Sequence, residues 1–184
     1  MAASAGGLTA LSSVLAELPA GFPASILVVQ HLDPRHRSLM ADIMSRRTRL
    51  DVKQAEEGDR LQAGRVYIAP PNRHLLLNPD GTLSLSQSEL VHFVRPSADL
   101  LFESVAASYR ERAIAVVLSG SGGDGSWGVK AIKKTGGTVI AQNESTSEFF
   151  GMPGAAIASG MVDFVLPLAE IAPALVTLVM RGEE

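Results

Sequence analysis

The sequence predicts an α/β fold: a doubly wound, three-layer α/β/α domain with a mostly parallel sheet and an antiparallel hairpin. Two apolar runs, residues 25–30 and 113–118, show no alternation of polar and apolar side chains, which is typical of strands buried on both faces. Helical patterns separate the predicted strands, and such alternation implies a parallel sheet covered on both sides. No repeat, low-complexity stretch or linker interrupts the chain, so we expect residues 1–184 to form a single domain.

The first half of the chain supplies the start of this pattern. Leucine and valine recur at helical spacing over residues 7–18, and Pro19 and Gly21 end that helix. The Asp80-Gly81 pair suits the tight turn of a hairpin. The elements expected after the first helix are the buried strand 25–30, a helix from Ser38 to Arg47, strands 52–55 and 66–69, and the hairpin strands 75–77 and 82–85.

The second half continues the alternation after a loop over residues 86–96. Pro96-Ser97 begins a helix that the pattern carries to about Tyr109, and a glycine-rich loop follows the second buried strand. The remaining expected elements are a helix over 126–135, a strand over 138–142, a short helix over 153–159, a strand over 162–165 and a last helix over 168–180.

Composition narrows the functional classes. Hydrophobic residues make up 46% and charged residues 19% of the 184 residues, which indicates a globular chain, and a formal net charge of -3 gives no reason to expect nucleic acid. The absence of cysteine excludes disulfides, thiol nucleophiles and cysteine metal sites, and it fits a reducing compartment. No basic residue precedes Arg35 and no apolar run approaches about 18 residues, so we expect a cytoplasmic protein without membrane insertion.

The first candidate for chemistry is Ser4. It lies between small residues, is followed by Gly6 and Gly7, and precedes a helical pattern, as a nucleophile turn of the G-x-S-x-G type requires. Ala2 stands where the first glycine of that motif would be, and only three residues precede Ser4 instead of a full strand. The alternative interpretation is a serine that caps the helix.

Two more polar residues follow predicted strands at the same edge of the sheet. In an open parallel sheet the site lies beyond the carboxyl ends of the strands, where His31 could serve as base for Ser4 and Asp124 could orient the imidazole. The alternative interpretations are that His31 is a partly buried hydrogen-bonding residue and that Asp124 caps the helix at 126. Asp33 is a rival orienter, although its proximity to His31 favours a role in its own turn.

Three alternatives concern other ligands. Gly120, Gly122 and Gly125 spell G-x-G-x-x-G between a strand and a helix, as in dinucleotide sites, but Asp124 would repel a pyrophosphate. His31, Asp33 and His36 are metal-ligand types, yet their spacing is not helical and Pro34 interrupts it, so a solvent-facing turn is the better interpretation. A cluster in the loop 143–152 is either part of the core or a hydrophobic wall for a substrate: Phe149, Phe150 and Met152.

Taken together, seven stretches resemble the catalytic domain of the CheB chemotaxis methylesterase family. They run along nearly the whole chain in the family's order: Ala3-Ser4-Ala5-Gly6-Gly7, Val28-Val29-Gln30-His31, Tyr67-Ile68-Ala69-Pro70, Pro96-Ser97-Ala98-Asp99-Leu100-Leu101-Phe102, Leu118-Ser119-Gly120-Ser121-Gly122-Gly123-Asp124-Gly125, Ile140-Ala141-Gln142-Asn143-Glu144 and Phe150-Gly151-Met152-Pro153. The resemblance implies that Ser4 is the nucleophile, His31 the base and Asp124 the orienting carboxylate.

The sequence departs from the family pattern in four respects. The strand before Ser4 is nearly absent, Ala2 replaces a glycine, and Ser121 stands where the family often has methionine, in a loop expected to help bind the oxyanion. The receiver domain usually found ahead of this domain is missing, so we expect phosphorylation control to come from elsewhere or to be absent.

The resemblance implies a serine esterase that removes methyl groups from glutamate methyl esters on chemoreceptor helices or related signalling proteins. The same machinery would deamidate glutamine, and it requires no metal and no organic cofactor. Two alternatives of other classes remain: a Rossmann-like nucleotide-binding module that uses Gly120, Gly122 and Gly125, and a non-catalytic receptor-docking domain.

Overall fold

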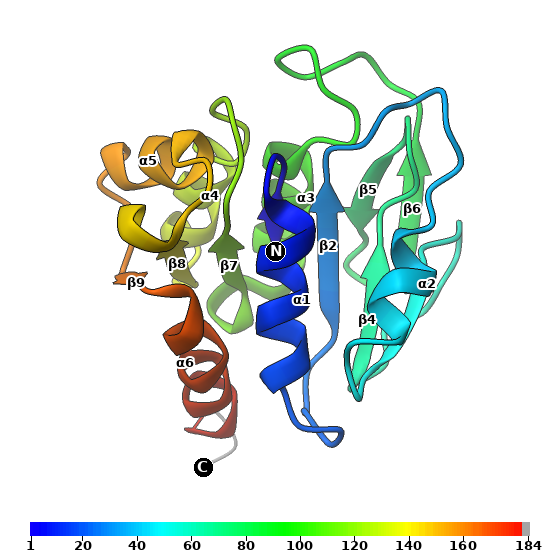
Figure 1. Cartoon of the computed structure of the whole chain (residues 1–184). Coiled ribbons are helices and arrows are strands. Elements are labelled where there is room, and N and C mark those ends of the chain that lie inside the picture. Colours follow the sequence, from blue (N-terminus) through cyan, green and yellow to red (C-terminus); the bar gives the residue numbers. More distant parts are fainter. Residues whose placement is uncertain (182–184) are drawn as a thin grey trace.

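The structure, a computed structural model, describes residues 1–181 and has two β-sheets (Figure 1). Seven parallel strands form the main sheet in the order β3-β4-β2-β1-β7-β8-β9, and β5 and β6 pair antiparallel as a separate two-stranded sheet. The strands are β1 (Ala2–Ala3), β2 (Ile26–Gln30), β3 (Asp51–Gln54), β4 (Arg65–Ile68), β5 (His74–Leu77), β6 (Leu83–Ser86), β7 (Ile114–Val117), β8 (Thr138–Gln142) and β9 (Phe164–Leu166).

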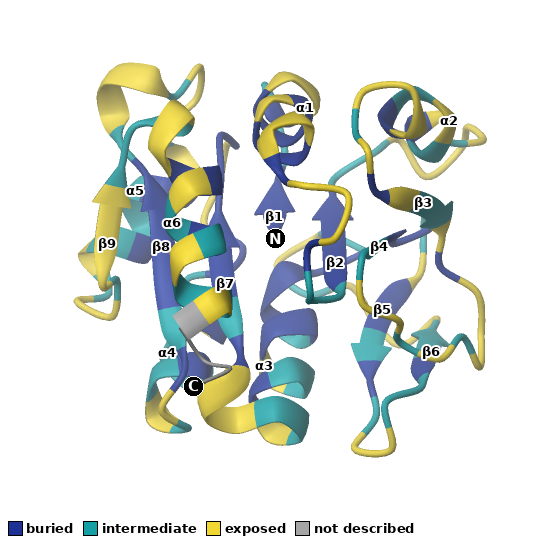
Figure 2. Cartoon of the chain, turned by 90° about the horizontal axis from the view of Figure 1, so that it is seen from below, coloured by how far each residue is buried: buried dark blue, intermediate teal, exposed yellow. Residues whose placement is uncertain are grey.

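Helices cover both faces of the main sheet, so the predicted three-layer architecture is confirmed (Figure 2). One apolar core joins the sheet to α1, α2 and α6, and a second core, on the opposite face, joins it to α3, α4 and α5 and to the hairpin. The helices are α1 (Gly7–Glu17), α2 (Met40–Ser45), α3 (Ala98–Tyr109), α4 (Gly128–Lys134), α5 (Gly151–Ala158) and α6 (Leu168–Arg181), with single 3-10 turns at Arg110–Arg112 and Glu144–Thr146.

Most predicted elements occur within two residues of their expected bounds, and the differences lie at element ends. α4 begins at Gly128 and not at 126, because the glycine-rich loop extends further, and β9 begins at Phe164 and not at 162. The backbone N–H of Asp163 donates to Val139 O while its carboxylate accepts from Val139 N and Lys133 Nζ. This cluster fixes the approach to β9, whose first residue is the one that follows Asp163.

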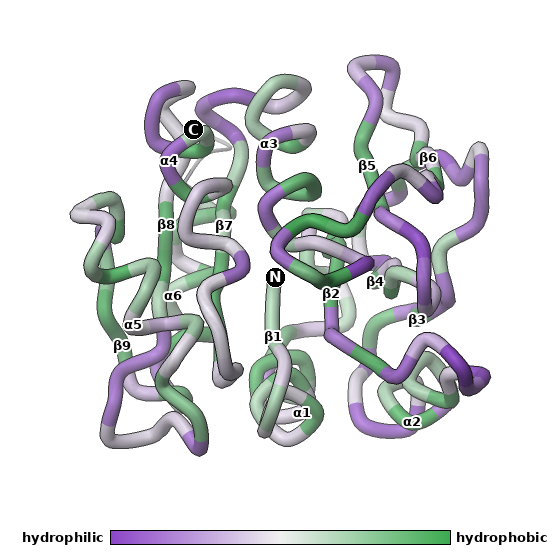
Figure 3. The backbone as a smooth tube through the Cα atoms, turned by 90° about the horizontal axis from the view of Figure 1, so that it is seen from above, coloured by the Kyte–Doolittle hydropathy of each residue, from purple (hydrophilic) through white to green (hydrophobic). Residues whose placement is uncertain are grey.

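The central strand β1 is short but fully buried. Ala2 and Ala3 have no exposed surface, and they pair in parallel with β2 on one side and with β7 on the other. Their extended conformation accommodates alanine at position 2. Seen from above, β1 lies between α1 and α3 at the centre of the molecule (Figure 3), so the residue after it emerges at the middle of the carboxyl edge.

Helix length bears on membrane insertion. None of the helices within residues 1–181 combines the length and the apolar character that a bilayer crossing demands.

Candidate active site

A tight turn at the end of β1 presents Ser4. The N–H of Gly7 donates to Ser4 O at 2.8 Å, and Gly6, the third residue of this four-residue turn, has φ 73° and ψ -1°. These angles are those of a type II turn, in which a residue with a side chain is strained at the third position. A Cβ on Gly6 would also lie 2.7 Å from the hydroxyl of Ser119. Glycine is therefore required at position 6 by both conformation and space.

Neighbouring strands hold the backbone of Ser4 from two sides. Its N–H donates to Ser119 O at 3.0 Å, and its carbonyl accepts from the side-chain amide of Gln30 at 2.8 Å. The hydroxyl of Ser119 donates in turn to Ala5 O at 2.8 Å and accepts from Phe149 N at 3.0 Å. The turn is thus fixed to the ends of both β2 and β7, while the Ser4 side chain stays half-buried.

His31 lies at the end of the adjacent strand. Ala3 is in register with Gln30, so Ser4 and His31 are the next residues along two neighbouring parallel strands, which lie about 4.8 Å apart. The imidazole of His31 is 16% exposed, and its Nε2 lies 2.7 Å from Oδ2 of Asp124, 93 residues further along the chain. Within the described residues the ring of His31 makes no hydrogen bond to Ser4 Oγ, a contact that often forms only when substrate is present.

Asp124 is buried against the start of α3. Only 4% of its side chain is exposed, and besides His31 it accepts hydrogen bonds from the hydroxyl of Ser97 at 3.0 Å and from the backbone N–H groups of Ala98 at 2.7 Å and Asp99 at 3.0 Å. Burial acts to raise the pKa of Asp124, but the hydrogen bonds from His31, Ala98 and Asp99 outweigh it, and the pKa lies below its ordinary value. The group is therefore an anion at neutral pH.

The cap of α4 is Asp99 and not Asp124. Oδ1 of Asp99 accepts from the N–H groups of Trp127 at 3.0 Å and Gly128 at 2.7 Å, whereas its buried Oδ2 has no partner. Burial raises the pKa of Asp99, and the nearby charge of Asp124 adds to the rise. The expectation that Asp124 could cap the helix near 126 is wrong, because that residue caps α3 instead. The N–H groups a pyrophosphate would need at α4 are already bound to Asp99.

Sequence reasoning missed three residues that support Asp124: Ser97, Asp99 and His74. His74 is fully buried, its Nδ1 accepts from Ser97 N at 3.1 Å and its Nε2 donates to Glu89 O at 2.9 Å. Ser97 and Asp99 stand in the cap and first turn of a helix, a pattern that could have flagged them. Nothing in the sequence distinguishes His74 from a surface histidine.

The other candidates in the sequence lie away from this cluster or in the core. The carboxylate of Asp33 accepts hydrogen bonds from the guanidinium and from the backbone N–H of Arg35, and these bonds lower the pKa of Asp33 to about 2. The same carboxylate also pairs with His36. The expectation that Asp33 organises its own turn is confirmed. Among residues 1–181, no group of three or more His, Asp or Glu side chains could hold a metal ion. Met152 is fully buried and belongs to the core, whereas Phe149 is 44% exposed.

The geometry suits acyl transfer. A buried carboxylate anion holds an imidazole in one orientation, and a half-buried hydroxyl stands beside that imidazole at the sheet edge. This is the order of groups that activates a serine in unrelated serine hydrolases, where the histidine takes the hydroxyl proton and the carboxylate stabilises the imidazolium.

Comparison with known proteins agrees with this chemistry. The family model described as CheB methylesterase matches residues 1–175. A crystal structure of the Thermotoga maritima CheB methylesterase catalytic domain is similar with a TM-score of 0.92 and 39% sequence identity, over 96% of this chain and 95% of that one.

Curated relatives include both short and long chains. A protein-glutamate methylesterase/protein-glutamine glutaminase 2 from Anaeromyxobacter dehalogenans is 47% identical over 173 residues, which are 94% of this chain and 50% of the relative. One of the same name from Burkholderia lata is 44% identical over 97% of this chain and 53% of its own length. A relative from Leptospira interrogans is 41% identical over 95% of this chain and 91% of its own length.

Proposed function

Since the chain belongs to the CheB methylesterase family, we propose that it hydrolyses glutamate methyl esters on the cytoplasmic helices of chemoreceptors, with Ser4 as nucleophile, His31 as base and Asp124 as orienting carboxylate. The observation that supports this most is the 2.7 Å hydrogen bond between His31 and Asp124, formed where the Ser4 turn emerges. The domain is proposed to span residues 1–184, and such substrates imply a cytoplasmic location.

The bond to Asp124 fixes which nitrogen of His31 is the base. Asp124 is an anion and only accepts, so the proton between the two groups sits on Nε2 of His31. The lone pair is then on Nδ1, and this nitrogen takes the proton of Ser4 as its oxygen attacks the ester carbon. The charge that develops on the imidazole lies 2.7 Å from the carboxylate that stabilises it.

Backbone N–H groups at the Ser4 turn are suited to hold the oxyanion. The N–H groups of Ser4 and Gly7 are already bound, to Ser119 O and Ser4 O. Those of Ala5, which follows the nucleophile, and Ser121, which follows Gly120 beside it, have no partner within residues 1–181 and are the proposed donors. One such donor contributes roughly 10²–10³ in rate. A serine at position 121 leaves that N–H unchanged.

The reaction closes in two steps. His31 passes the proton from Nδ1 to the leaving methoxide, and methanol departs as the acyl-enzyme on Ser4 forms. Water then attacks the acyl carbon while His31 takes its proton, and glutamate and free Ser4 are restored. A glutamine side chain would follow the same course with ammonia as the leaving group, and every step uses groups of the chain and water.

The test is methanol release from methylated chemoreceptor fragments. The wild-type chain is expected to release methanol and the Ser4→Ala variant to release none above the rate without enzyme, with an unchanged thermal unfolding profile. Undiminished release by the variant would overturn the assignment of the nucleophile. A wild-type chain that binds the fragments but releases no methanol would indicate the alternative, a non-catalytic docking domain.

A further inference from the structure

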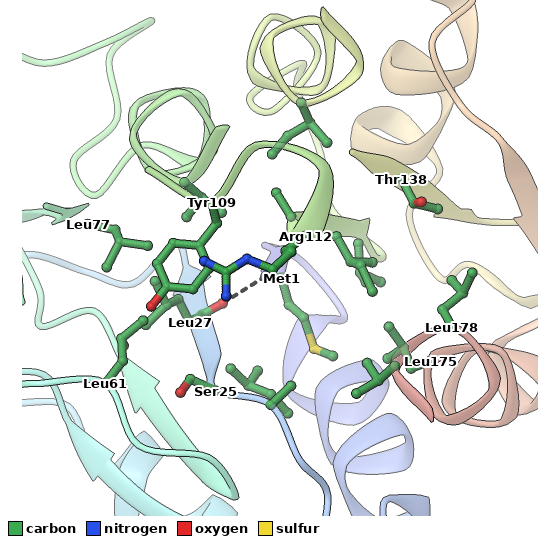
Figure 4. A pocket seen from close by; sticks show the side chains of 18 of the residues that line it. Met1, Ser25, Leu27, Leu61, Leu77, Tyr109, Arg112, Thr138, Leu175 and Leu178 are labelled. Carbon is green, nitrogen blue, oxygen red and sulfur yellow. Dashed lines mark hydrogen bonds between the residues drawn. The ribbon is translucent and has the colours of Figure 1, made fainter. Parts of the chain in front are cut away.

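Residues 87–95, between β6 and α3, form an arm that stands above the carboxyl edge of the main sheet. Figure 1 shows this arm in green, rising higher than the turn that carries Ser4. The cavity of about 680 Å³ in Figure 4 lies at the opposite edge, among the first residues of β2, β7 and β8. A substrate that reaches Ser4 therefore approaches on the side of the arm and not on the side of that cavity.

The tip of the arm is a tight hairpin with a strained backbone. Val91 and Val94 exchange two hydrogen bonds of 3.0 Å, and the residues between them, His92 and Phe93, have φ of 46° and 68°. A two-residue hairpin with positive φ at both central positions usually contains Asn-Gly or Gly-Gly, because bulky side chains are strained there. Glycine would thus suit the backbone at position 93 better than phenylalanine does.

The ring of Phe93 gives the fold nothing in return for this strain. Its residue is 95% exposed, and Leu90 in the same arm is 52% exposed. A single exposed apolar side chain is ordinary on a protein surface, but this one stands at a strained position and is almost free of contacts within residues 1–181. Backbone strain of this kind is characteristic of functional sites.

The base of the arm, in contrast, is firmly held. The guanidinium of Arg95 donates to Oδ1 of Asn72 at 2.7 and 3.0 Å. It also donates to the carbonyl oxygens of Gln87 and Ser88, at 3.2 and 2.8 Å. One side chain therefore ties the end of the arm both to its beginning and to the segment after β4, so the arm presents its tip in a defined position.

A second support joins the arm to the active site. Nε2 of the buried His74 donates to Glu89 O at 2.9 Å, and its Nδ1 accepts from Ser97 N at 3.1 Å. The hydroxyl of Ser97 donates to Asp124 at 3.0 Å, the carboxylate that holds His31. The arm and the orienting carboxylate thus share one rigid support, and a binding element that is already ordered loses less conformational freedom when its partner binds.

Further exposed apolar side chains lie in the segments next to the Ser4 turn. Leu8, in the first turn of α1, is 39% exposed. Phe149, which is hydrogen-bonded through its backbone to the loop after β7, is 44% exposed. With Leu90 and Phe93 they place apolar surface on three different segments around Ser4. Apolar groups gathered at one site are typical of a surface that contacts a protein partner.

We propose that residues 87–95 are a docking arm for the protein substrate. Phe93 and Leu90 contact apolar side chains of the helix that carries the esterified glutamate, and this contact holds the glutamate over Ser4. The inference rests on the proposed function and adds a substrate preference to it. Because the arm and the Ser4 turn belong to different elements, a helix reaches both at once, whereas a small methyl ester reaches Ser4 alone.

The first test measures the binding of a methylated chemoreceptor fragment to chains that carry Ser4→Ala, so that no hydrolysis occurs. Phe93→Ala is added in one chain and Phe164→Ala in another, as a control, since Phe164 is also exposed but lies on β9 at the end of the main sheet. We expect Phe93→Ala to raise Kd about tenfold or more and Phe164→Ala to leave it within about twofold. An unchanged Kd with Phe93→Ala, or equal weakening by both substitutions, would overturn the proposal.

The second test compares two substrates in chains that retain Ser4. With Phe93→Ala, kcat/KM for the methylated fragment should fall about tenfold more than kcat/KM for p-nitrophenyl acetate. Equal losses would show that the ring acts on the chemistry at Ser4 and not on docking. A wild-type chain that hydrolyses p-nitrophenyl acetate but no methylated fragment contradicts the proposed function, and the comparison of Kd values then still decides whether the arm binds.

The variant Phe93→Gly separates docking from a structural role of the ring. Glycine adopts positive φ without strain, so we expect Tm to be at least as high as in the wild type, while the Kd for the fragment rises as it does with Phe93→Ala. A Tm lower by about 4 °C or more would show that the ring stabilises the folded chain, which contradicts the proposal.

Discussion

The substitution Asp124→Asn tests whether the buried carboxylate orients His31. Oδ2 accepts from His31 Nε2 and Ala98 N, and Oδ1 accepts from the hydroxyl of Ser97 and from Asp99 N. An asparagine has one oxygen for these four donors. If that oxygen keeps the place of Oδ1, the amide nitrogen takes the place of Oδ2. This nitrogen is itself a donor, and it then faces two other donors, His31 Nε2 and the Ala98 N–H.

The expected losses follow from this mismatch. The Ala98 N–H becomes a buried donor without an acceptor, and the contact with His31 survives only if the amide donates to Nε2. Each unsatisfied buried group costs about 1–3 kcal/mol, so we expect the free energy of unfolding to fall by about 2–4 kcal/mol. The imidazole proton moves to Nδ1, the nitrogen that should accept from Ser4, and kcat/KM is expected to fall by about 10³–10⁴.

The assay pairs hydrolysis of a p-nitrophenyl ester with urea unfolding, and the control is Ser97→Ala. That variant removes one donor to Oδ1 of Asp124 and leaves the bond to His31 in place. We expect it to lose about 1–2 kcal/mol of stability and to keep kcat/KM within about threefold of the wild type. The reasoning is refuted if Asp124→Asn keeps wild-type activity, or if both variants lose activity equally.

Three further predictions concern the Ser4 turn and Asp99. Gly6→Ala should cost about 1–3 kcal/mol more stability than Gly160→Ala, because both have φ 73° but only Gly6 is crowded by neighbouring side chains; equal losses in urea unfolding would show that the turn yields. Ser119→Ala removes the donor to Ala5 O. Expressed as free energies, the loss of esterase kcat should exceed the loss of stability derived from Tm. An unchanged kcat would show that the hydrogen bond from Ser119 does not support the Ser4 turn in catalysis. The raised pKa of Asp99 means that the folded chain holds the proton of this carboxyl group more tightly than the unfolded chain does. The free energy of unfolding therefore falls as the pH rises from the ordinary pKa of 3.8 to the raised pKa of the folded chain. Asp99→Asn should lack that part of the decline in unfolding free energy measured across pH, and an unchanged slope would contradict the assignment.

The sequence allowed Ser4, His31 and Asp124 to be chosen because each follows a predicted strand, and parallel strands end at one edge. The contacts that hold Asp124 were not predictable in the same way. They come from the start of α3, more than twenty residues away, and burial of a carboxylate is a property of packing that no local pattern encodes.

The prediction that Asp124 caps α4 was wrong for the same reason. Asp124 stands at the usual distance before that helix, so local chemistry favours it as the cap. Asp99 takes the position because α3 and α4 pack together, which brings its carboxylate to the N–H groups of Trp127 and Gly128.

The proposed chemistry requires Ser4 to be activated by a histidine from another strand. A fluorophosphonate that reacts with activated serines, followed by mass spectrometry of the peptides, tests this most directly. We expect a single adduct on Ser4 in the wild-type chain and a labelling rate reduced by at least about 10²-fold in His31→Ala. An adduct on a different serine, or labelling of Ser4 at the same rate without His31, would contradict the account.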